Sequence, residues 1–98
     1  DRALFLRFVP RCKRVAEAGW EPITHARSNS DSVYVERFGK RYLTVFNDSP
    51  RRQRVLVSTD FDLPESCMEL VNAQSLTPAN NTLTLTLHPE TVALIDLQ

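Results

Sequence analysis

Two strand-like runs joined by one glycine form the stretch SVYVERFGKRYLTVFN, residues 32–47, which decides the expected fold. β-Branched, aromatic and aliphatic residues, which suit a pleated and half-buried surface, dominate both runs. Gly39 can adopt a positive φ without strain, so we predict a hairpin with a two-residue turn at Gly39 and Lys40. This turn places Val33 opposite Phe46 and leaves apolar residues on both faces, so the hairpin is expected to need cover on both sides. One face carries Tyr34, Phe38, Leu43 and Val45, and the other carries Val33, Val35, Tyr42 and Phe46.

The length and composition indicate one small domain. The chain has 98 residues, of which 42% are hydrophobic, which is enough for a single core. No apolar run approaches the roughly 20 residues of a membrane span, and the charged, apolar and small-residue order of a signal peptide is missing. We therefore expect no membrane partner. Because the sequence does not begin with Met, we expect a fragment or a processed chain.

The net charge is zero, but the charges are unevenly distributed along the chain. Residues 1–54 hold all 12 basic residues and six acidic ones, and residues 55–98 hold the other six acidic residues. We expect the two halves to interleave so that their charges offset. The alternative is a basic face for nucleic acid or an acidic protein. The basic residues lack the aromatic interleaving of single-strand binders, so we expect no nucleic-acid partner.

Residues 3–18 are predicted to form an amphipathic helix. Its apolar residues recur at intervals of three and four, and its basic residues lie off this stripe. Pro10 either kinks the helix or begins it as the first helical residue, and Gly19 is a suitable stop. One small sheet face must cover the whole stripe, or another domain must do so. The stripe consists of Leu4, Phe5, Phe8, Val9, Cys12, Val15 and Ala16.

After the predicted helix, short apolar runs alternate with turn signals. The clearest run is Thr82–Leu87, where threonine and leucine alternate as in a strand with one buried face and one wet face. The stretch 72–81 is predicted to be a polar connection. The predicted strands are 23–27, the two hairpin runs, 51–59, 68–71, 82–87 and 92–97. This order predicts a mainly β fold: an antiparallel β-sandwich of about six to seven strands preceded by one N-terminal α-helix.

Metal-ligating residues are few and poorly spaced. The two cysteines, Cys12 and Cys67, are too few for a disulfide framework. Neither His25 nor His88 lies at a metal-ligand interval from them. Two buried free thiols are the expected state, and a bridge between the cysteines is the alternative. We predict no metal site and no cofactor.

The carboxylates give weak signals for chemistry. Glu36 lies within the hairpin and could act as a general acid if it is buried, but we favour an ion pair with Arg41 on the same face. Asp60 and Asp62 could supply oxygen ligands to calcium, although a solvated loop is the simpler interpretation. No GxSxG, HExxH or glycine-rich phosphate loop occurs in the sequence. We predict no catalytic residue in this chain.

Trp20, Tyr34 and Tyr42 are the candidate substrate-binding residues. Flat aromatic faces stack on the apolar face of a pyranose, so exposed rings at these positions would form a sugar platform. The alternative places the rings in the core, which we favour for the single tryptophan that follows the helix. The exposure of the rings decides between the two.

Three segments resemble the tail of a TIM-barrel glycoside hydrolase. They are 18–27 (AGWEPITHAR), 33–39 (VYVERFG) and 42–47 (YLTVFN). In that family the last barrel helix leads through a short link into a C-terminal antiparallel β-sandwich. The closing run 84–97, with a proline-containing turn before an apolar terminal strand, is similar to the end of those sandwiches.

The resemblance implies two parts: residues 1–19, a helix that belongs to or packs on a preceding barrel domain, and residues 20–98, a β-sandwich. It implies a non-catalytic C-terminal module that braces the barrel of a glycosidase, whose catalytic carboxylates sit on barrel strands. The implied partner is the catalytic barrel of the same protein, with carbohydrate as a second candidate. Two alternatives stay open: an autonomous carbohydrate-binding module that uses exposed aromatics, and a small enzyme that uses Glu36.

Overall fold

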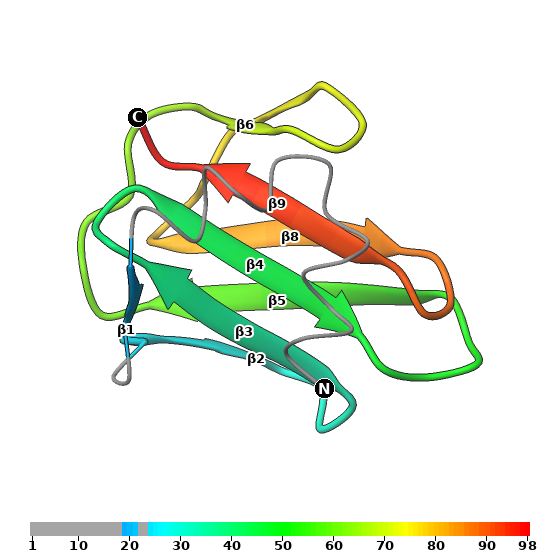
Figure 1. Cartoon of the computed structure of the whole chain (residues 1–98). Helices are drawn as coiled ribbons and strands as arrows, with labels where there is room; N and C mark the ends of the chain where they lie inside the picture. Colours follow the sequence, from blue (N-terminus) through cyan, green and yellow to red (C-terminus); the bar gives the residue numbers. More distant parts are fainter. Residues whose placement is uncertain (1–18, 22–23) are drawn as a thin grey trace.

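The computed structural model describes residues 19–21 and 24–98. The helix predicted at 3–18, with Pro10 and Cys12, lies outside the described residues and stays a prediction. The described residues form two antiparallel sheets stacked as a sandwich (Figure 1), which confirms the predicted mainly β class. In this part of the chain, no helix has the length and apolar character that a membrane crossing requires.

The larger sheet forms one layer and the smaller sheet forms the other (Figure 1). The strand order is β1-β3-β4-β9-β6-β7 in the larger sheet and β2-β5-β8 in the smaller sheet. Four of these strands have only two or three residues, which explains why the described residues contain more strands than the six to seven predicted. The bounds are β1 Trp20–Glu21, β2 Ala26–Ser28, β3 Val33–Phe38, β4 Tyr42–Asn47, β5 Gln53–Thr59, β6 Cys67–Glu69, β7 Gln74–Leu76, β8 Thr82–Leu87 and β9 Val92–Asp96.

The main core lies between the two sheets and follows the two-residue period of the strands. The leucines of β8 are buried while Thr84 and Thr86 are exposed, as the alternating pattern predicts. The valines of β5 pair with these leucines across the smaller sheet. We name the buried set between the sheets the inner cluster. It comprises Val33, Leu43, Val45, Val55, Val57, Cys67, Leu76, Leu83, Leu85, Leu87, Ala93, Ile95 and Leu97.

The central hairpin forms, but the predicted register is wrong by one residue. β3 and β4 pair Phe38 with Tyr42 and Val33 with Asn47, so the loop has three residues, 39–41, instead of two. Gly39 has a φ of 59°, in the left-handed region that glycine tolerates. Because successive side chains point to opposite faces, a shift of one residue exchanges the faces of β4 relative to β3. The valines of β3 therefore share the core face with the leucine and valine of β4.

The larger sheet also buries apolar side chains on its outward face, away from the smaller sheet. Along β4 and β9 these side chains alternate with those of the inner cluster. The four most buried are at most 8% exposed, although no strand in the described part of the chain lies against that face. The hairpin is thus apolar on both sides, as expected. We name this set the outer cluster: Phe38, Tyr42, Val92 and Leu94, with Phe46 and Leu70 packed against it.

The polar stretch 72–81 contains a strand that the sequence pattern did not indicate. Gln74–Leu76 forms β7 and pairs with β6, where Cys67 lies opposite Leu76. Only Leu76 of this strand is buried, so no alternation marks it. The strand predicted at 23–27 is also displaced, because β2 spans Ala26–Ser28. Its partner β5 holds it in place through backbone pairing, which the local sequence does not encode.

A buried polar network joins the two sheets at one end. The Asn47 Nδ2 atom donates to three backbone carbonyls, of which that of Arg51 is closest at 2.8 Å. The Asn47 Oδ1 atom accepts from Ser49 Oγ at 2.7 Å and from Gln53 Nε2 at 3.0 Å. Asn47 ends β4 of the larger sheet and Gln53 begins β5 of the smaller sheet. The network therefore fixes the two layers relative to each other.

Candidate functional site

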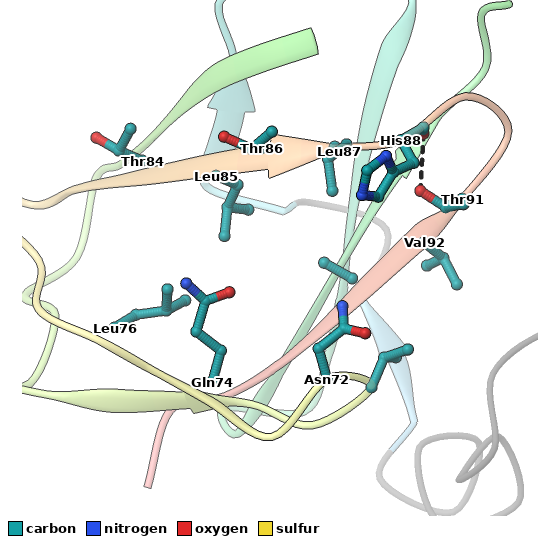
Figure 2. Close-up of a pocket in the computed structure, with 12 residues that line it drawn as sticks. Asn72, Gln74, Leu76, Thr84, Leu85, Thr86, Leu87, His88, Thr91 and Val92 are labelled. Atoms are coloured by element: carbon teal, nitrogen blue, oxygen red, sulfur yellow. Dashed lines mark hydrogen bonds between the residues drawn. The ribbon is translucent and has the colours of Figure 1, made fainter. Parts of the chain in front are cut away.

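A pocket of about 240 Å³ lies between the edge strand β8 and the β6–β7 hairpin (Figure 2). The smaller sheet ends at β8, whereas the larger sheet continues from β9 through β6 to β7. The core is therefore open to one side at this end of the sandwich. The lining comes from the β6–β7 turn, β7, β8 and the start of β9.

Apolar side chains line the pocket on both sides, and polar amide side chains reach in from the hairpin side (Figure 2). Leu85 and Leu87 point into it from β8, whose threonines point to the other side of the strand. The amides of Asn72 and Gln74 reach in from the β6–β7 hairpin. His88 closes one end, where its carbonyl accepts a hydrogen bond of 2.7 Å from Thr91 Oγ1.

This lining suits a small neutral ligand that makes apolar contacts on both sides and hydrogen bonds to the amides of the hairpin. None of the described lining residues is Asp, Glu, Lys or Arg, and none is Trp, Tyr or Phe. The pocket therefore holds neither the carboxylate pair of a glycosidase nor an aromatic stacking surface.

The predicted aromatic residues lie away from the pocket and differ in exposure. Tyr34 is 54% exposed, whereas Tyr42 belongs to the outer cluster and is 2% exposed. The Arg41 guanidinium lies 5.1 Å from the centroid of the Tyr42 ring. Trp20, in β1, pairs through its backbone with Phe38 of β3. The Trp20 side chain lies outside the described part of the structure. Of the two tyrosines, only Tyr34 has a side chain exposed to solvent.

Arg41, the predicted partner of Glu36, forms a bidentate ion pair with Asp96. The Nε–Oδ1 and Nη2–Oδ2 distances are both 3.0 Å. This hydrogen bond to the carboxylate raises the pKa of Arg41, which keeps the guanidinium charged. The pair closes the hairpin loop onto the last strand, because Tyr42 lies opposite Asp96 in the sheet.

The described residues contain no group of three or more His, Cys, Asp or Glu side chains placed to hold a metal ion. Asp60, a predicted calcium candidate, instead accepts a hydrogen bond of 3.1 Å from Arg27 Nη1 at the surface. Cys67 is a buried free thiol, as expected, and burial raises its pKa. Its proposed bridge partner Cys12 lies outside the described residues.

The sequence analysis missed the pocket residues. Asn72 and Gln74 lie in the stretch predicted to be a connection, and His88 lies in a predicted turn. They meet only because β7 pairs with β6 and β6 pairs with β9. The one local signal, two amide residues in a polar stretch, fits an exposed loop equally well.

Comparison with known proteins assigns no family to this chain. No protein-family model matches it, and no curated protein matches its sequence. The class that the fold defines is an all-β domain of two stacked antiparallel sheets.

Proposed function

We propose that this chain is a non-catalytic β-sandwich module that braces the catalytic barrel of a glycoside hydrolase-like enzyme. The observation that carries the proposal is the larger sheet, which has apolar clusters on both faces. Antiparallel sheets commonly leave one face to water, so a sheet whose two faces are both apolar requires a covering layer in addition to the smaller sheet. A sandwich that follows residues 1–19 also has the layout that the resemblance implies. In this proposal residues 1–19 connect the sandwich to the barrel.

The bonding of the carboxylates supports a structural role. Asp96 pairs with Arg41, and the buried Glu69 accepts hydrogen bonds of 2.8 to 2.9 Å from three backbone N–H groups, including that of Leu94. Carboxylates held in this way stabilise loops and strand ends. A glycosidase instead needs two carboxyl groups that face a shared substrate site about 5 to 10 Å apart.

The sequence encoded upstream of Asp1 provides the first test. We expect a repeating strand–helix pattern of roughly 200 residues or more, as in a TIM barrel. An upstream sequence without this pattern would contradict the proposal.

Deletion of residues 20–98 from such a longer protein provides the second test. We expect the remaining barrel to unfold at a lower temperature, while kcat for each folded molecule is nearly unchanged. A folded barrel that has lost its activity would assign the sandwich a direct part in catalysis and contradict the proposal.

The exposed ring of Tyr34 favours a second candidate function, an autonomous carbohydrate-binding module. Calorimetric titration of residues 1–98 with a panel of oligosaccharides tests it. Binding heat that Tyr34→Ala removes and Tyr34→Phe retains would support this alternative, because phenylalanine keeps the stacking face. Absence of heat with every sugar would exclude it for that panel.

A further inference from the structure

The outer cluster lies on a sheet face against which no described strand packs, and we infer that residues 3–18 of this chain cover it. The segment would dock as a helix with its apolar stripe on the cluster. Both surfaces belong to one chain, so the inference does not depend on the proposed function. It assigns the apolar stripe of residues 3–18 to the outer cluster, and the same segment would still lead into the barrel of the proposed function.

The described chain begins at the border of the outer cluster. The Gly19 carbonyl accepts a hydrogen bond of 2.7 Å from the Gly39 N–H, and Trp20 pairs with Phe38, a member of the cluster. Gly19, the first described residue, therefore lies at the border of the outer cluster. Gly19 has a φ of 89°, the left-handed conformation that commonly follows the last residue of a helix.

The length of the segment fits the face. Residues 3–18, as a helix, would be about 24 Å long at about 1.5 Å per residue. The face measures about 19 Å across the four strand spacings from β1 to β6, and about 20 Å along a six-residue strand. A helix that starts from Gly19 can therefore cross the cluster in either direction.

The composition of the segment fits as well. Its stripe contains two phenylalanines and several aliphatic residues, which match the aromatic and aliphatic outer cluster. Residues 1–18 have five basic and two acidic residues, a net charge of +3, and residues 19–98 have seven basic and ten acidic residues, a net charge of −3. The two parts therefore attract each other. A second copy of the chain on this face would leave the stripe of the first copy uncovered.

Disulfide trapping in the full chain tests the inference. Cys12 lies on the stripe, about 10 Å of helix from Gly19. Thr44 lies on the outward face, in the second strand from β1 across the sheet. Thr44→Cys in a Cys67→Ala background is expected to form an intramolecular bond with Cys12 in glutathione buffer. The matched control is Thr84→Cys, an exposed mid-strand position on the outward face of the smaller sheet.

We expect the effective concentration of Cys12 at position 44 to exceed that at position 84 by about tenfold or more. Peptide mapping identifies the bond, and a non-reducing gel separates bonds within a chain from bonds between chains. Equal trapping at both positions would overturn the inference. A bond mainly between two chains would also overturn it, because the occupant would then be a second copy.

A double-mutant cycle decides the question if Thr44→Cys fails to fold. Phe8→Ala and Phe46→Ala are made singly and together in the full chain. If the segment covers the cluster, the double variant should melt at least about 4 °C higher than the sum of the single shifts predicts. Purely additive shifts would mean that the two side chains do not interact, and the inference would be wrong.

Discussion

At the scale of single residues, the buried amide of Asn47 connects parts of the chain that are distant in sequence. It donates to carbonyls in the 48–52 loop and at the β8–β9 turn, and it accepts from Gln53. We expect Asn47→Ala to lower the free energy of unfolding by about 2 to 4 kcal/mol, because buried carbonyls lose their donors. Urea denaturation measures the loss. The control is the exposed neighbour Asp48→Ala, with an expected change within about 0.5 kcal/mol; equal losses would contradict the role of the network.

The buried thiol of Cys67 should make the stability of the fold depend on pH in the alkaline range. Burial raises the pKa of this thiol in the folded state, with a smaller contribution from Asp96. Below the ordinary thiol pKa, both the folded and the unfolded state are protonated and the full stability is present. As the pH rises above that value, the unfolded chain releases the proton first, so stability falls until the pH passes the raised folded pKa.

The measurement is a series of urea denaturations at increasing alkaline pH. The chain with Cys12→Ala is compared with the chain that carries both Cys12→Ala and Cys67→Ala, so that all other titrating groups are shared. We expect the form with Cys67 to lose stability more steeply. Parallel curves would mean that the thiol is as accessible in the folded state as in the unfolded state.

At the scale of elements, the hairpin loop depends on the left-handed conformation of Gly39. We expect Gly39→Ala to cost about 1 kcal/mol, because a Cβ atom disfavours this region, and Gly39→Asn to cost less, because asparagine tolerates it. Thermal unfolding should show a Tm lowered by several degrees for alanine. An alanine variant as stable as the parent would show that the loop adopts another conformation in solution.

The hairpin also shows why its location was predictable and its register was not. A β-strand period and a glycine mark the element, but loops of two and three residues are both compatible with Gly39. Register is strongly specified where only one face is apolar, and here both faces are. The pairing of β4 with β9 and the contact with the smaller sheet select the observed register. In Thr82–Leu87 only the leucine face is apolar, so its orientation followed directly from the sequence.

At the scale of the whole molecule, the inner cluster holds the two sheets together. Ile95 is fully buried in it, so we expect Ile95→Ala to lower the free energy of unfolding by about 3 kcal/mol through a lost apolar contact and a cavity. Leu56 is 42% exposed on the outward face of the smaller sheet, and Leu56→Ala is expected to cost about 1 kcal/mol or less. Urea denaturation of both variants checks this. Similar losses would mean that the layers stack differently.

The pocket is likewise a property of the whole molecule. It exists because the larger sheet extends past β8, and its amide side chains come from a hairpin docked on β9. The local sequence around Asn72 and Gln74 does not indicate which strand these side chains will face in the folded chain. The sequence therefore predicted none of this site. The aromatic residues that it singled out lie elsewhere, with Tyr34 exposed and Tyr42 buried.

By itself, the sequence determined that the described part of this chain is built from short antiparallel strands, because alternation and turn residues act over a few neighbouring positions. It also determined that the hairpin has two apolar faces. Successive side chains of a strand point to opposite faces, and apolar residues occupy consecutive positions in both hairpin strands. Only the tertiary structure decided the register, the existence of β7, the partner of Arg41 and the location of the pocket. Each of these depends on pairing between segments that are far apart in the chain, and such pairing is selected by the combined burial of all the strands.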